Sequence, residues 1–144
     1  FNYLESQGFD HLHRSADYVL SQPNQFWEDE HDFIQWLLPL SEKSMSVPNS
    51  PVLRGVEADW IRQSSSAQLT IKAAANRLLS FLNEIQSWRS RFNHNHLRIT
   101  RAIRSLRLLV SDADADLFRA SVIEMLGDDF ALINDKSRIY WFES

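Results

Sequence analysis

The sequence contains no cysteine among its 144 residues. This absence excludes disulfide bridges, thiolate metal sites and cysteine nucleophiles. Glycine and proline are scarce, with three and four residues, which is too few for a β-sandwich or barrel rich in tight turns. No apolar run approaches the roughly 20 residues that a membrane-spanning helix needs. These absences favour a helical protein with no transmembrane segment.

Targeting signals and phosphate-binding loops are missing as well. No secretory signal peptide opens the chain, and a first residue of Phe1 instead of Met suggests a trimmed chain or a fragment. The three glycines, Gly8, Gly55 and Gly127, lie too far apart to form a glycine-rich phosphate loop. We therefore expect a soluble, intracellular protein, most simply a cytoplasmic one.

Large apolar side chains are plentiful. Hydrophobic residues make up 44% of the chain and charged residues 24%, with five Trp and nine Phe. This composition is ordinary for a folded globular domain with a real core. The length suits one domain, and no linker or repeat divides it. We expect a single domain over residues 1–144.

The net charge of −4 hides an uneven distribution. Residues 1–60 carry ten acids and three bases, residues 61–111 carry nine bases and one acid, and residues 112–144 carry eight acids and three bases. The simplest interpretation is that a basic helix packs between acidic ones and pairs its charges internally. A sharper interpretation is a site for an anion, such as a phosphate, a carboxylate or nucleic acid.

Apolar residues recur at helical spacing nearly throughout, and no segment alternates as a strand does. Ser64–Ser66 and Ser111 are candidate N-caps, and Gly127 is a candidate helix terminator. Residues 39–51, with Pro39, Pro48 and Pro51, are predicted to form an irregular connection. We predict an all-α protein, a single compact bundle of five to seven helices. The predicted helices cover residues 11–20, 24–37, 56–63, 67–87, 95–110 and 112–126, with a last turn at 137–142.

A continuous helix over residues 24–37 would carry a broad apolar face and one contiguous polar stripe. Within it, Glu30 falls inside the apolar arc, where a carboxylate needs a partner or a nearby helix end. Trp36 falls on the polar side and must be covered by another element or a ligand. The polar stripe consists of Glu28, His31, Asp32 and Gln35.

The helix predicted over residues 95–110 has an aliphatic half and a basic half. Leu97 and Leu108 fall on the basic half, and His94 joins it if the helix extends that far. Such a face is not simply solvated, so either acidic helices or a ligand must pack on it. Its arginines are Arg98, Arg101, Arg104 and Arg107.

Few catalytic constellations fit these residues. The spacing Glu28-x-x-His31 occurs in di-iron and di-manganese bundles, but those sites need the pair twice and two further glutamates. We therefore expect no metal and no cofactor. The simplest interpretation of His31 is a helix-edge imidazole that is hydrogen-bonded to Glu28 or to a backbone carbonyl.

Two segments resemble a known family. Residues 28–39 match the pattern Glu-x-x-His-x-Tyr/Phe-Ile-Gln-Trp-Leu-Phe-Pro, except that Leu38 replaces the second Phe. Residues 94–106 match a His/Asn-rich run into Leu-Arg-Ile-Thr-Arg followed by an aliphatic helix. Both signatures are similar to those of the opioid growth factor receptor conserved domain, and we expect the resemblance to span nearly all of residues 1–144.

The resemblance implies a receptor-like role. The family's vertebrate member is described as a receptor for enkephalin-type peptides that is found around the nucleus. A perinuclear or nuclear location would follow if this chain behaves alike, although its short length is more typical of a stand-alone, microbial member without repetitive tails. The resemblance also draws attention to polar motif residues that a core does not require.

We expect the two motifs to meet at one cleft that binds a short peptide or another small anionic or zwitterionic ligand. An arginine would hold a carboxylate or phosphate, Glu28 or Asp32 an amine, and Trp36 an apolar group. One alternative is a small enzyme with His31 or His94 as general base; another is nucleic-acid or protein binding through the helix from Arg98 to Arg107, which the pI near 5.7 disfavours for nucleic acid. The predicted ligand-binding residues are Glu28, His31, Gln35, Trp36, His94, Asn95, Arg98 and Arg101.

Overall fold

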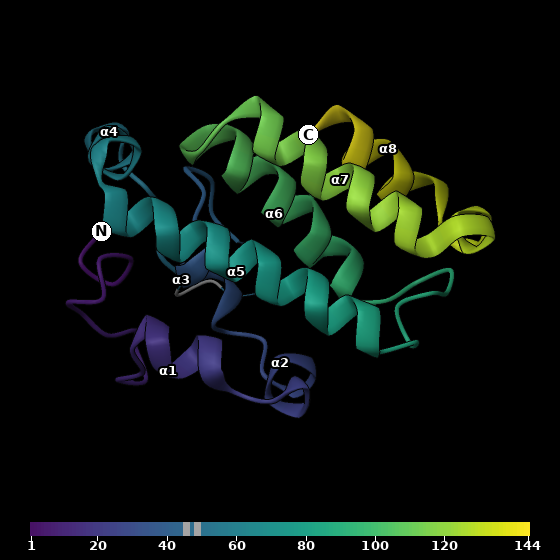
Figure 1. Ribbon diagram of the computed structural model, residues 1–144, viewed down its shortest axis with the longest axis horizontal. Helices are drawn as coiled ribbons and strands as arrows, with labels where there is room; N and C mark the ends of the chain where they lie inside the picture. The colour runs from purple at the N-terminus through teal and green to yellow at the C-terminus, as the bar shows by residue number, and fades with distance from the viewer. Residues whose placement is uncertain (45–46, 48–49) are drawn as a thin grey trace.

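The computed structural model describes residues 1–44, 47 and 50–144, and within them every regular element is a helix. Five α-helices have seven or more residues, and three are shorter. The all-α prediction is confirmed (Figure 1). The longer helices are α4 (Gly55–Gln63), α5 (Ser65–Glu84), α6 (Asn95–Leu109), α7 (Asp112–Leu126) and α8 (Asp135–Glu143); the others are α1 (Ala16–Ser21), α2 (Asn24–Asp29), α3 (Ile34–Leu37) and the 3-10 helix η1 (Gly127–Leu132).

The long helices begin and end where local sequence signals place them. The hydroxyl of Ser64 accepts a hydrogen bond from the amide of Ala67 and caps α5. The hydroxyl of Ser111 accepts one from the amide of Asp114 and caps α7. Gly127 then ends α7 with a φ of +54°, a conformation that a side chain disfavours. The predicted helix at 137–142 is longer than expected, because Asn134 caps it at Asp135.

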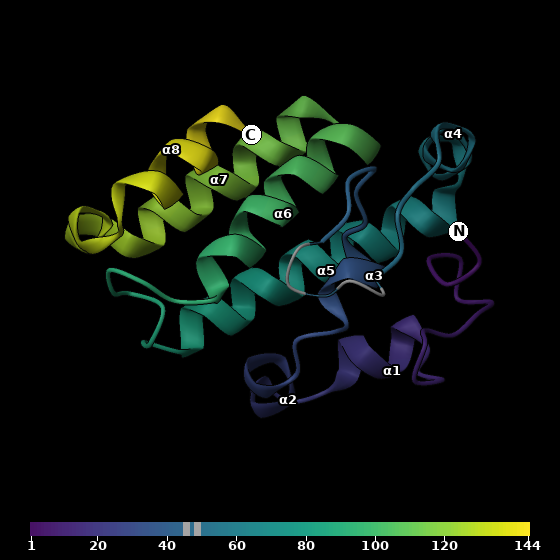
Figure 2. The same ribbon diagram turned by 180° about the vertical axis from the view of Figure 1, so that it is seen from behind.

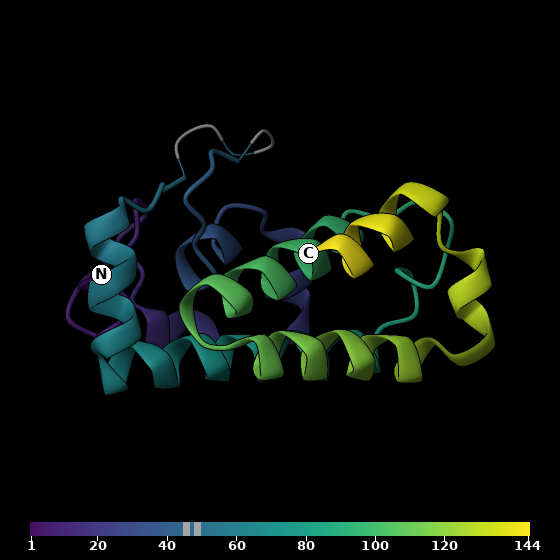
Figure 3. The same ribbon diagram turned by 90° about the horizontal axis from the view of Figure 1, so that it is seen from above.

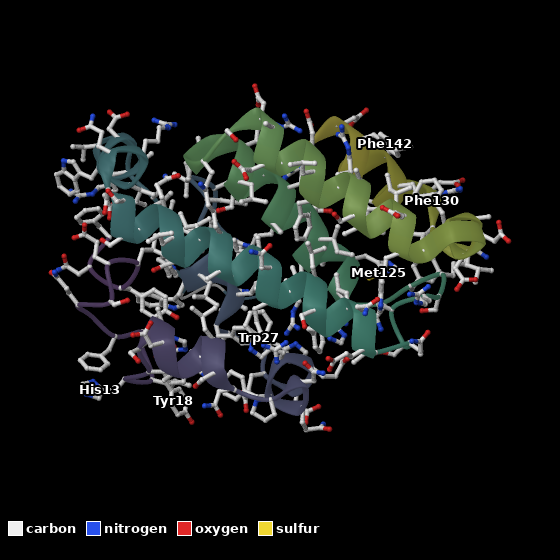
Figure 4. All side chains as sticks on the ribbon, viewed as in Figure 1. His13, Tyr18, Trp27, Met125, Phe130 and Phe142 are labelled. Carbon is white, nitrogen blue, oxygen red and sulfur yellow. The ribbon has the colours of Figure 1, made fainter. Side chains whose placement is uncertain are left out.

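The helices form two layers around one apolar core. Seen from above, α5 and α7 lie in one layer, and α6 and α8 lie over them (Figure 3). From behind, α3 and the chain around it lie against the central part of α5, beside α6 (Figure 2). The indole of Trp27 is fully buried between α2 and α5, 6.3 Å from the ring of Phe81 (Figure 4). The α6 helix therefore has one side in the core and another facing the segment that follows α2.

The predicted helix over residues 24–37 is wrong as a continuous element. It ends at Asp29, where Glu30 turns extended with φ −85° and ψ 138°, and a separate short helix begins at Ile34. The side chain of Glu30 consequently lies in solvent and not in an apolar arc. The break separates the two halves of the predicted polar stripe.

The first predicted helix also begins later than expected. Asp10 accepts hydrogen bonds from the amides of Leu12 and Arg14, which hold residues 11–14 in a turn, and Ser15 then caps α1. In the predicted connection 39–51, Leu53 donates to the carbonyl of Leu40, and Pro48 lies outside the described residues. None of the described helices is long and apolar enough to cross a membrane.

Candidate functional site

A cleft of about 620 Å³ lies along α6 between the chain that follows α2 and the end of α8. We call it the α6 cleft. Both sequence motifs contribute to it, since residues 31–35 form one wall and residues 94–101 form another. Its lining consists of His31, Ile34, Gln35, Leu40, Glu42, Lys43, Ser44, His94, Leu97, Arg98, Thr100, Arg101, Arg104 and Tyr140.

At one end of the cleft two histidines meet a carboxylate. Nε2 of His94 lies 2.8 Å from Oε1 of Glu28, and the ring of His31 stands edge-on to that of His94 with centroids 5.1 Å apart. Burial and the charge of Arg98 lower the pKa of His94, although Glu28 opposes the shift. His94 is therefore expected to be neutral at pH 7, with Glu28 fixing the orientation of its ring.

Arg98 is a buried cation whose hydrogen bonds go to the backbone. It is 5% exposed, and its guanidinium donates to the carbonyls of Trp27 and Glu30, the latter at 2.5 Å. Trp27 lies in the last turn of α2 and Glu30 is its C-cap, so these carbonyls have no partner within the helix. Burial lowers the pKa of Arg98 to about 10, partly offset by Glu28, so the group stays charged at neutral pH. Arg98 thus caps α2 and brings its positive charge to the cleft wall.

Arg101 repeats this arrangement one turn later. Its guanidinium donates to the carbonyl of Leu38, the C-cap of α3, at 2.9 Å. Burial lowers the pKa of Arg101, and Glu42 partly offsets the effect. Ser105, on the next turn, donates to the carbonyl of Pro39 at 3.0 Å. One face of α6 therefore fixes the backbone of residues 27–39 through side-chain donors.

The other arginines of α6 meet acceptors near the chain end and on neighbouring elements. Arg104 contacts Glu42 at 3.1 Å and donates to the hydroxyl of Ser144. Arg107 pairs with Asp112 and Asp116 of α7. The interpretation of internal charge pairing thus describes Arg104 and Arg107, whereas Arg98 and Arg101 bind carbonyl oxygens.

The structure brings together five of the eight predicted site residues as cleft lining: His31, Gln35, His94, Arg98 and Arg101. Glu28 lies behind His94. Asn95 is fully buried, and its Oδ1 accepts from Arg98 at 3.2 Å. Trp36 lies elsewhere, against the rings of Tyr3 and His11, so it does not face the cleft. Asp32, the other proposed amine partner, pairs with His11 and Arg14.

Sequence reasoning missed several lining residues. Lys43 and Leu40 lie in the segment treated only as an irregular connection, and Tyr140 lies in the last helix. No local pattern relates these positions to α6, since they reach the cleft through tertiary packing alone. Among the described residues, no group of three or more metal-ligating side chains is placed to hold a metal ion.

The described lining is strongly cationic. Four of its residues carry a positive charge, and Glu42 is the single carboxylate among them. Glu42 is already close to Arg104. Cations that line a concave surface attract anionic ligands and raise their local concentration. The fold and the site together define an all-α domain with a cationic cleft on its central helix.

Comparison with known proteins gives this class a family. The chain matches the model of the opioid growth factor receptor (OGFr) conserved region over residues 16–142, and it belongs to that family. The human opioid growth factor receptor is 33% identical over 98 residues, which cover 55% of this chain and 14% of the human protein. The chain thus spans about one-seventh of that relative's length. No solved structure matches it.

Proposed function

We propose that this domain is an intracellular, receptor-like binding module that holds a small anionic ligand, a short peptide above all, in the α6 cleft. The cationic lining of this concave site carries the proposal. Arg101, Arg104 and Lys43 supply positive charge at its surface, and Arg98 adds to the field from beneath. The human relative is named a receptor, which agrees with a binding role.

The same arginines argue against a nucleic-acid role for α6. A nucleic-acid face presents its cations to the phosphate backbone. Here Arg98 is buried, Arg101 reaches back to Leu38, and Arg107 pairs with two aspartates. A compact ligand that enters the cleft fits this arrangement better than an extended polyanion.

A ligand screen with matched variants tests the proposal. Short peptides, nucleotides and dicarboxylic acids are added to the wild type, Arg101→Gln and Arg62→Gln, and the melting temperature is followed. Arg62 is the control because it also donates to a helix-end carbonyl, that of Leu108 at 2.8 Å, but does not line the cleft. A ligand at about 100 times its Kd adds roughly 2.7 kcal/mol to the free energy of unfolding.

We expect at least one anionic probe to stabilise the wild type and Arg62→Gln, and to stabilise Arg101→Gln far less. The proposal fails if no probe stabilises the wild type, or if all three proteins respond equally. A loss of stability of free Arg101→Gln alone would reflect the lost hydrogen bond to Leu38, so the comparison is made on ligand-induced shifts.

A second candidate function is acid–base catalysis at the cleft end. The contact between Glu28 and His94, with His31 edge-on beside it, supports this candidate. In such a site Glu28 orients the ring, and a neutral His94 accepts a proton from the ligand. The variant His94→Gln distinguishes the two functions. If the protein is a binding module, neither the wild type nor His94→Gln forms a product, and the variant keeps its ligand affinity. If the protein is an enzyme, the wild type turns the ligand over and His94→Gln binds it without turnover.

A further inference from the structure

The α6 cleft combines its cations with an apolar surface. Leu97 is 61% exposed although it lies on the basic half of α6, and it lines the cleft together with Ile34, Leu40 and the ring of Tyr140. Exposure of a leucine side chain to water is unfavourable. Contact with an apolar group of a ligand would remove Leu97 from water, while the arginines nearby bind the charged group of that ligand.

The cleft has little to offer a ligand's positive charge. Glu42 is the single carboxylate of the described lining, and its Oε1 is 3.1 Å from Arg104. Glu28 is the next carboxylate, and it is engaged with His94. An ammonium group placed here would lose water and meet Arg101, Arg104 and Lys43, which is unfavourable.

From this asymmetry we infer that the α6 cleft binds a peptide by its C-terminal carboxylate, with an apolar last side chain against Leu97 and Tyr140 and the N-terminal amine outside. The inference rests on the proposed function of the same site and adds the direction of the peptide. The carboxylate is held by Lys43 and by the guanidinium nitrogens that Arg101 and Arg104 do not use toward Leu38, Ser144 and Glu42. An arginine presents a planar fork of donors that fits a carboxylate.

Four synthetic peptides test the direction. The parent is Ala-Ala-Ala-Leu with both ends free; the others are its N-acetylated form, its C-terminal amide and the analogue that ends in Ser. Dissociation constants are measured by isothermal titration calorimetry. We expect acetylation to change the Kd by less than about threefold, amidation to weaken binding by about tenfold or more, and the Ser analogue to bind about tenfold more weakly. Equal affinity of the acid and the amide, or a large loss on acetylation, overturns the inference.

Two surface variants link these effects to the cleft. Lys43→Gln removes one exposed cation and should narrow the difference between the free acid and the amide. Leu97→Ser should remove the preference for Leu over Ser at the peptide end. Leu69→Ser is the matched control, since Leu69 is 68% exposed on α5 and does not line the cleft. If both leucine variants behave as the wild type does, the apolar contact is wrong.

Other anions separate failure of this inference from failure of the proposed function. Octanoate carries a carboxylate and an apolar chain without a peptide, and inorganic phosphate carries the charge alone. Stabilisation by phosphate or octanoate without binding of the parent peptide overturns the peptide direction and leaves a binding cleft for small anions. If none of these probes binds and the wider screen is also negative, the proposed function falls with it.

Discussion

Helices α5 to α7 differ from the segment 10–44 in where the information for their structure lies. In α5 to α7, apolar residues at helical spacing and caps at Ser64 and Ser111 suffice to place the elements within a few residues. In the segment 10–44, the short helices α2 and α3 end where side chains of α6 meet their carbonyls. Short helices are marginal alone, so tertiary contacts decide their limits.

The largest expected effect is a loss of stability in the region of the long helices. Leu78 is fully buried in α5, and Leu78→Ala leaves a cavity in the core. We expect the free energy of unfolding to fall by about 3 kcal/mol. Urea denaturation measures the loss, and the transition should stay cooperative. Leu69→Ala, on the exposed side of the same helix, should change stability by less than about 0.5 kcal/mol; a similar loss there would contradict the packing.

The next largest effect is a loss of stability in the region of the short helices. Arg98→Met removes the donors to the carbonyls of Trp27 and Glu30 and leaves them without their cap. We expect a loss of about 2 kcal/mol. Hydrogen exchange should report it as faster exchange over residues 24–38, with α5 to α7 still protected. Faster exchange in α7 with residues 24–38 unchanged would show that Arg98 does not hold this segment.

The smallest expected effect is a pH dependence of stability that comes from His96, where the start of α6 contacts the loop between α5 and α6. Nε2 of His96 lies 2.7 Å from the carbonyl of Trp88, which assigns the proton to that nitrogen, and none of the described residues offers a partner to its Nδ1. Burial lowers the pKa of His96, outweighing the hydrogen bond to Trp88. Below the usual histidine pKa of about 6.5 the unfolded chain takes up a proton that the folded chain does not, so stability falls as the pH falls.

This dependence is measured by denaturation between pH 7 and pH 5. The slope should approach about 1.4 kcal/mol per pH unit for this one group and level off below the folded pKa. His94, whose pKa burial also lowers, adds in the same direction. His96→Gln should make the curve shallower. A stability that is constant or rises as the solution is acidified would contradict the assignment.

The sequence predicts the helical class and the long helices because their signals are local. The interruption between Asp29 and Ile34 was not predictable in that way, since it depends on a hydrogen bond that Arg98 donates to the carbonyl of Glu30, 68 residues away in the sequence. The same interruption explains why Glu28 and Asp32 have different partners at the site. Within one continuous helix Glu28 and Asp32 would share a stripe, but in the folded chain Glu28 meets His94 and Asp32 meets Arg14. The motifs identified the walls of the cleft, whereas Lys43 and Tyr140 required the tertiary structure.

The hydrogen-bond donors of α6 affect which positions of this domain tolerate substitution. Arg98, Arg101 and Ser105 hold carbonyl oxygens of residues 27, 30, 38 and 39, and every amino acid carries that oxygen. Even Pro39, which has no amide hydrogen to donate, serves as an acceptor. As far as these contacts are concerned, the side chains of the held segment can be exchanged while the three donors cannot. A library that randomises position 30, whose side chain is exposed, should therefore retain far more folded members than one that randomises position 98.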